Sequence, residues 1–289
     1  MARQVEVVRL GDGRAVGLAA HGDPNGRPVF LLHGTPSSRL GFDVVAEPAR
    51  ARGVRVLCPD RPGIGRSDPA PTSGRVGDYA AELAALADAL EIDSFAVLGY
   101  SGGGPFALAA AALLPERVHG VGLVAGVGPL DRPGARESLS KTDVVLLDLC
   151  ERMPRIAGAV LRAMGAGTRA APSMAVRIFK TDLRRADRHA LDTDGQGLAL
   201  MASFVEALRQ GPGGVIDDYR IPARQWDFAL ADVHLPVQLW QGEDDTVVPP
   251  ARSEDLAEGL PNAVLHRLPG EGHISILRRM GEILDSVAP

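Results

Sequence analysis

Hydrophobic residues in this chain gather in short runs, and stretches of helical periodicity separate most of these runs. Two runs near the N-terminus, residues 5–10 and 15–20, flank Gly11-Asp12-Gly13 and predict an antiparallel hairpin. The later runs are short and apolar and predict further strands, of which residues 95–98 indicate a buried one. These predicted strands lie at residues 29–32, 54–58, 95–98, 118–124, 237–240 and 263–268.

Helical stretches follow most of the predicted strands. Residues 76–90, for example, place their apolar side chains on one helical face. Strands that alternate with helices indicate a parallel sheet covered on both sides. We therefore predict an α/β fold with a mostly parallel eight-stranded sheet, helices on both faces and an inserted helical cap. The helices of the main body are expected at residues 42–52, 76–90, 253–260 and 276–287.

The predicted insertion occupies residues 130–229, where we find no convincing strand. Pro212-Gly213-Gly214 and Ile221-Pro222 indicate loops within it. We predict a core of residues 1–129 and 230–289, with the cap over the carboxyl ends of the strands, where open α/β sheets bind ligands. The helices expected in the cap span residues 142–152, 156–164, 174–180 and 198–209.

Charge and composition exclude several classes of protein. The 289 residues carry a formal net charge of −5, so no broad basic face for nucleic acid is expected. The first residues do not form a signal-peptide pattern, and no apolar run approaches the ~18 residues of a membrane span. Cys58 and Cys150 are too few for a disulfide framework or a cysteine metal site. We therefore expect a cytoplasmic protein without a membrane partner.

The segment Gly99-Tyr100-Ser101-Gly102-Gly103 fits the pattern G-x-S-x-G. An apolar strand precedes it and an alanine-rich helix follows it, which is the context of a nucleophile elbow. Such a turn exposes the serine hydroxyl, and the next backbone N–H lies at a helix N-terminus, where donors are free. We predict that Ser101 is a nucleophile and that the Gly102 N–H contributes to an oxyanion hole.

A serine nucleophile needs a base and a carboxylate that orients the base. Asp245 and His273 follow the last two predicted strands, in the order Ser, Asp, His that this elbow requires. Asp244 is the next choice for the acid, and Asp131 is a minor alternative. The other oxyanion donor is expected from His33-Gly34-Thr35, with the Thr35 N–H as donor, Gly34 allowing close approach and His33 ordering the loop.

These segments resemble the α/β-hydrolase fold family in its capped form. The resemblance lies in His33-Gly34, in the run from Asp60 to Asp68, in the elbow, in Gly242-Glu-Asp-Asp245 and in Gly272-His273. It implies a Ser-His-Asp hydrolase acting on a small molecule. Two features differ from parts of the family. The loop reads His-Gly-Thr-Pro rather than His-Gly-Gly-Gly, and the nucleophile is a serine, not the aspartate of haloalkane dehalogenases and epoxide hydrolases.

The leading hypothesis is a serine hydrolase that cleaves a small, mostly apolar ester or lactone through an acyl-enzyme. One alternative is a non-catalytic ligand receptor or binding protein on the same scaffold. Another is an acyltransferase or cofactor-free peroxidase that uses the same triad. No complete G-x-G-x-x-G, P-loop or His-Glu-x-x-His motif occurs, so we expect no cofactor and no metal. The sequence does not indicate the oligomeric state.

Overall fold

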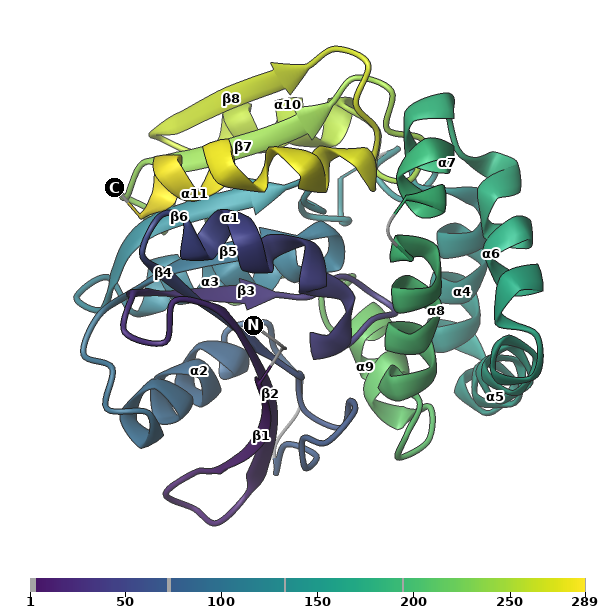
Figure 1. Ribbon diagram of the computed structural model, residues 1–289, viewed down its shortest axis with the longest axis horizontal. Helices are drawn as coiled ribbons and strands as arrows, with labels where there is room; N and C mark the ends of the chain where they lie inside the picture. Colours follow the sequence, from purple (N-terminus) through teal and green to yellow (C-terminus); the bar gives the residue numbers. More distant parts are fainter. Residues whose placement is uncertain (1–3, 72–73, 133, 194, 289) are drawn as a thin grey trace.

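The computed structural model describes residues 4–71, 74–132, 134–193 and 195–288 and contains an eight-stranded sheet (Figure 1). The strand order is β1-β2-β4-β3-β5-β6-β7-β8. The pairs β1–β2 and β2–β4 are antiparallel and the other neighbours are parallel, which confirms the predicted α/β class. The strands are β1 (Gln4–Arg9), β2 (Ala15–Gly22), β3 (Arg27–Leu32), β4 (Val54–Pro59), β5 (Phe95–Tyr100), β6 (Val118–Val124), β7 (Val237–Gly242) and β8 (Ala263–Leu268).

Helices cover both faces of the sheet because side chains point alternately to its two sides. Along β3, Val29 and Leu31 pack into the cluster that contains α1 and α11, whereas Phe30 and Leu32 pack into the opposite cluster. Every residue of the central strand β5 is buried, as its apolar run predicts. One face carries α1 (Ala46–Arg50) and α11 (Met280–Val287), and the other carries α2 (Asp78–Ala89), α3 (Gly104–Leu113) and α10 (Ala251–Gly259).

The helix expected at residues 42–52 is wrong in its bounds and its form. The segment begins as a 3-10 helix, Arg39–Val45, and becomes α-helical only over α1. Phe42 leaves helical geometry at φ −124° and ψ 27°. Its side chain is 2% exposed and packs edge-on against Tyr100, with ring centroids 5.7 Å apart. The Phe42 ring is buried in the core at the point where the helix breaks. The helical periodicity of the sequence does not predict this break.

Between β6 and β7 the described residues form six α-helices, α4 to α9, on the side toward which the parallel strands point (Figure 1). We refer to them as the cap helices. Four of them correspond to predicted helices, although α5 is longer than expected. The predicted division of core and cap near residues 129 and 230 stays a prediction. The cap helices are α4 (Lys141–Arg152), α5 (Pro154–Ala170), α6 (Pro172–Phe179), α7 (Arg185–Asp192), α8 (Gln196–Ala207) and α9 (Gly213–Arg220).

Two cap helices, α7 and α9, are absent from the sequence prediction. The glycines that predicted a loop at residues 212–214 instead open α9, so that prediction is wrong. A Cβ on Gly214 would lie 2.5 Å from the carbonyl carbon of Gly63, so close packing against the core accounts for a glycine that helix propensity disfavours. In α7 most residues are polar, and only Asp187, Ala190 and Leu191 are buried. Both helices have buried contacts with neighbouring segments, and their sequences alone do not indicate a helix.

None of the helices in the described part of the chain combines the length and the apolar composition that a membrane span needs.

Candidate active site

Ser101 stands on a strained turn between β5 and α3. Its φ is +52°, a left-handed value that a residue with a side chain adopts rarely. A one-turn 3-10 helix, Ser101–Gly103, connects it to α3. The turn also requires small neighbours, because a Cβ on Gly99 would lie 2.7 Å from the carbonyl oxygen of Gly103. This is the geometry of a nucleophile elbow, in which the serine projects from the sheet edge.

His273 and Asp245 meet in a buried contact at the same edge of the sheet. His273 Nδ1 lies 2.8 Å from Asp245 Oδ2, and the two side chains are 5% and 0% exposed. The other oxygen of Asp245 accepts the backbone N–H groups of Val247 and Val248 at 2.8 and 2.9 Å. This carboxylate is thereby oriented, and it fixes Nδ1 as the protonated nitrogen, leaving Nε2 able to accept a proton.

The neighbouring acids do not take this place. Glu243 is exposed and Asp244 is half-buried, whereas Asp245 faces the ring. Asp131, the minor alternative, is exposed at the surface. The structure therefore puts the acid preferred from the sequence, rather than its alternatives, beside His273.

Tyr100, the last residue of β5 and the neighbour of Ser101, supports the loop that contains His273. The Tyr100 hydroxyl donates to the carbonyl oxygen of His273 at 3.0 Å, and the two rings are 5.2 Å apart.

Among the described residues no hydrogen bond joins Ser101 Oγ to His273. Catalytic hydrogen bonds are often long in unliganded enzymes and shorten when substrate binds.

Carboxylates surround His273 and alter its acidity. Burial lowers the pKa of His273, but the Asp245 carboxylate, with smaller contributions from Asp187 and Asp143, more than reverses this effect. The net result is a pKa above the ordinary 6.5. A negative environment of this kind also stabilises the imidazolium that forms when a histidine takes a proton from serine.

The predicted oxyanion donors lie side by side next to Ser101. A Cβ on Gly102 would lie 3.1 Å from the Thr35 nitrogen, and a Cβ on Gly34 would lie 3.1 Å from the Ser101 Cβ. Glycine at these two positions thus lets two backbone segments approach closely. No hydrogen bond of the described residues uses the Thr35 N–H, and the Gly102 N–H lies in the first turn of a helix.

His33 and Arg61 hold the Thr35 loop from behind. His33 Nδ1 donates to the Gly34 carbonyl at 2.8 Å, and the Arg61 N–H donates to His33 Nε2 at 3.2 Å. Burial, with the nearby Arg61 charge, holds the pKa of His33 well below its ordinary value, so the ring is neutral. The Arg61 guanidinium donates to the Gly34 carbonyl at 3.1 Å and pairs with Asp218 of α9 through Nε at 2.7 Å.

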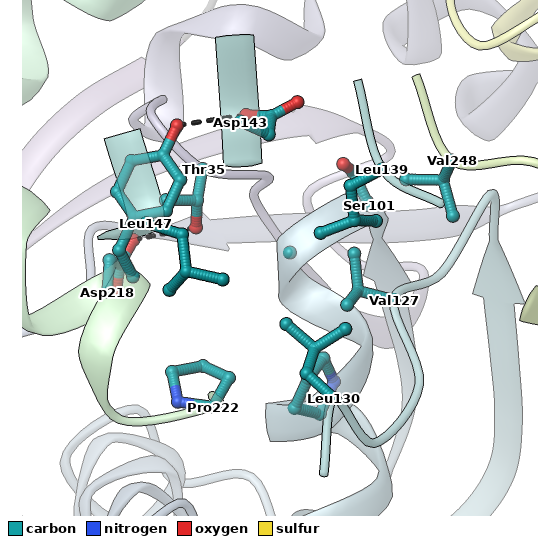
Figure 2. A pocket seen from close by; sticks show the side chains of 13 residues that line it. Thr35, Ser101, Val127, Leu130, Leu139, Asp143, Leu147, Asp218, Pro222 and Val248 are labelled. Carbon is teal, nitrogen blue, oxygen red and sulfur yellow. Dashed lines mark hydrogen bonds between the residues drawn. The ribbon is translucent and has the colours of Figure 1, made fainter. Parts of the chain in front are cut away.

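A pocket between the cap helices and the sheet edge includes Ser101, Thr35 and Gly102 in its wall (Figure 2). Two carboxyl groups also line it. Asp218 is paired with Arg61, whereas Asp143 of α4 accepts hydrogen bonds from the hydroxyls of Tyr219 at 3.0 Å and Ser140 at 2.6 Å. Most of the remaining wall is apolar and includes Val127, Leu130, Leu139, Leu147, Pro222 and Val248.

Arg61, Asp143, Asp187 and Asp218 contact the candidate site although the sequence analysis assigned them no role. Asp218 and Asp187 lie on the two helices that were not predicted, so no pattern placed them near the site. Arg61 lies in the run from Asp60 to Asp68 that resembles the family, and Asp143 lies in the predicted helix at residues 142–152, but neither signal indicated a role. Within the described ranges no group of three or more His, Cys, Asp or Glu residues is arranged to hold a metal ion.

Comparison with known proteins agrees with this fold. The model of the alpha/beta hydrolase fold family matches residues 27–279, and the chain belongs to that family. A Dechloromonas aromatica enzyme named 2-hydroxy-6-oxononadienedioate/2-hydroxy-6-oxononatrienedioate hydrolase 1 is 30% identical over 251 residues, covering 85% of this chain and 80% of that protein. A non-heme chloroperoxidase of Streptomyces lividans is 29% identical over 272 residues, 92% of each protein.

Solved structures show the same fold. A bromoperoxidase from Bacillus anthracis aligns with a TM-score of 0.73 and 19% identity, covering 97% of this chain and 98% of that one. The proteins compared therefore include hydrolases and haloperoxidases. Membership of the family, with relatives named as a hydrolase and a chloroperoxidase, supports a hydrolase-type enzyme. The reaction must be argued from the site itself.

The raised pKa of His273 predicts the pH dependence of any reaction that uses it as a base. A protonated ring cannot accept the serine proton, so kcat/KM for a neutral substrate should increase with pH. Half of the plateau should be reached above pH 6.5, because the folded protein keeps the ring protonated to higher pH than usual. A pH–rate profile checks this, and a flat profile from pH 5.5 to 8.5 contradicts it.

The contact between Asp245 and His273 predicts that kcat depends on the charge of Asp245 and not on the charge of its neighbour Asp244. Asp245→Asn should lower kcat on the order of 10³- to 10⁴-fold, because the amide favours the wrong ring tautomer. Asp244→Asn is the matched control and should leave kcat near the wild-type value. Steady-state kinetics with thermal melts checks both variants. A larger loss from Asp244→Asn would overturn the assignment of the acid.

Proposed function

We propose that this protein is a serine hydrolase that cleaves a small, mostly apolar ester or lactone through an acyl-enzyme. One observation carries the proposal: a buried Asp245–His273 pair lies at the same sheet edge as a serine in strained elbow geometry. A strained residue persists only where the surrounding structure enforces it, and such residues cluster at functional sites. A protein that only bound a ligand would have no need of the buried acid–base pair.

The first half of the proposed reaction acylates the serine. Ser101 Oγ attacks the substrate carbonyl carbon while His273 Nε2 takes the hydroxyl proton. The carbonyl oxygen becomes an oxyanion next to the N–H groups of Thr35 and Gly102, and each such donor is typically worth about 3 kcal/mol to the transition state. The tetrahedral intermediate then expels the alcohol, which receives its proton from His273.

The second half releases the acid. Water attacks the acyl-enzyme carbonyl carbon, and His273 takes a proton from that water. The second tetrahedral intermediate collapses, Ser101 leaves with the proton held by His273, and the carboxylic acid departs. Asp245 holds the ring in one tautomer and faces its positive charge in both halves. The reaction consumes one ester and one water and needs no cofactor.

The pocket wall favours a neutral substrate over an anionic one. The D. aromatica relative is named for dioates, which carry two carboxylates. Among the residues lining this pocket there is no lysine or arginine. The Asp143 carboxyl accepts hydrogen bonds from two hydroxyls, and no salt bridge between described residues includes it. A substrate carboxylate placed there would be desolvated and repelled. We infer that the acyl group is apolar and that this chain does not share the dioate preference.

The chloroperoxidase relative provides a specific reason to keep a second candidate. An acyl-enzyme at Ser101 can be attacked by hydrogen peroxide in place of water, which yields a peracid and returns the serine. The same residues serve both reactions, and the nucleophile that reaches the acyl group decides between them. Hydrolysis is our first choice because water is the more abundant nucleophile.

The proposed function predicts turnover of simple esters that depends on Ser101. p-Nitrophenyl esters of increasing acyl length should release phenolate with wild-type protein, and Ser101→Ala should abolish nearly all of it while binding persists. Ser173→Ala, an exposed serine of α6, is the control and should match wild type. Spectrophotometry at pH 8 reports the rates. Turnover that survives Ser101→Ala would end the serine mechanism.

The Asp143 carboxyl predicts that the enzyme prefers a neutral ester over one that carries a carboxylate. At pH 8 the enzyme should prefer p-nitrophenyl hexanoate over mono-p-nitrophenyl adipate, which adds a terminal carboxylate, by on the order of tenfold or more in kcat/KM. Asp143→Asn keeps both hydroxyl partners in reach and should reduce this preference. Asp148→Asn, on the same helix and paired with Arg152, is the control. Equal rates on both esters in the wild type would refute the charge argument.

A further inference from the structure

The cap helix α7 reaches the histidine loop through one buried carboxylate. Asp187 is 0% exposed, and its oxygens face the segment between β8 and α11. Asp187 Oδ2 accepts the His273 N–H, and Oδ1 accepts the N–H groups of Ile274 and Ser275, each at 2.9 Å. Three consecutive backbone donors therefore converge on a residue that lies 86 positions earlier in the chain.

The loop is shaped to receive that carboxylate. A Cβ on Gly272 would lie 2.6 Å from the Asp187 Cγ, so only glycine leaves room for this approach. The Gly272 N–H donates to Ser275 Oγ at 2.8 Å, and the Tyr100 hydroxyl donates to the His273 carbonyl. The backbone of His273 is thus held from the cap on one side and from β5 on the other.

The energetics make this contact a strong restraint. No ion pair of the described residues includes Asp187, so the three N–H donors are the hydrogen-bond partners that compensate for burying the carboxylate. Hydrogen bonds to an ionised acceptor are roughly twice as strong as neutral ones. Separating α7 from the loop would remove all three together and leave the carboxylate and three N–H groups without these partners.

We propose that Asp187 is a positioning residue that sets the orientation of His273 toward Ser101, so that docking of α7 is required for catalysis. The inference rests on the proposed function, because it assigns His273 the role of the base. Asp187 does not line the substrate pocket, so its effect passes through the loop. A shift of about 1 Å in a catalytic group can cost roughly 100-fold in rate.

Asp187→Asn is the direct test, because the amide keeps the shape but offers one acceptor oxygen for three donors and carries no charge. We expect kcat to fall roughly 10- to 100-fold with little change in KM. Asp192→Asn is the matched control, since Asp192 ends the same helix, bonds to Lys180 and does not contact the loop. It should keep wild-type kinetics.

The pH profile tests whether the Asp187 charge acts on the His273 ring. The charged or titratable groups around His273 are Asp245, Asp187, Asp143 and the Tyr100 hydroxyl. Removing the charge at 187 removes one cause of the raised pKa of His273, so the rising limb of kcat/KM should move to lower pH.

Gly272→Ala tests the same contact from the loop side and replaces Asp187→Asn if that variant does not fold. Hydrogen exchange of the native proteins should show lost protection confined to residues 273–275 in either variant. Wild-type kcat, pH profile and protection in a folded Asp187→Asn or Gly272→Ala protein would overturn the proposal. If the wild-type protein cleaves no ester, the proposed function fails, and the exchange experiment still tests the contact between Asp187 and the loop.

Discussion

The burial of charged and polar groups between the cap helices and the loops that carry Thr35 and His273 is the constraint on which the candidate site depends. Asp218 of α9 pairs with Arg61 behind the Thr35 loop, and Asp187 of α7 holds the His273 loop. Ser203 of α8, itself fully buried, bonds to the hydroxyls of Ser37 and Ser38. A buried polar group that loses its partner is costly, typically 1–3 kcal/mol and more when it is charged. The cap helices therefore form part of the frame that sets the site.

The features predicted from the sequence are those that a short segment of the chain indicates by itself. The elbow around Ser101, the positions of the strands along the chain and the preference for Asp245 were predicted from apolar runs and the residues at their ends. The contacts of Asp187 and Asp218 did not follow, because each depends on a pairing over more than 80 positions and lies on a polar or glycine-led helix. Such helices form because their partners exist in the folded core, and periodicity within one segment cannot show this.

Membership of the alpha/beta hydrolase fold family leaves the reaction open, since relatives at similar identity are named as a dioate hydrolase and a chloroperoxidase. The pocket wall of this chain bears on the choice of substrate. It is largely apolar, its Asp218 is paired with Arg61, and its Asp143 accepts hydrogen bonds from hydroxyl groups. The apolar wall and the Asp143 carboxyl together favour neutral substrates. These residues are separate from the proposed triad of Ser101, His273 and Asp245.

The central claim is that Ser101 becomes covalently acylated. A fluorophosphonate probe, followed by proteolysis and mass spectrometric mapping of the adduct, tests that claim most directly. The account predicts rapid, stoichiometric labelling on the peptide that contains Ser101, and no labelling in Ser101→Ala. A folded wild-type protein that stays unlabelled, or an adduct mapped to another residue, would contradict the account.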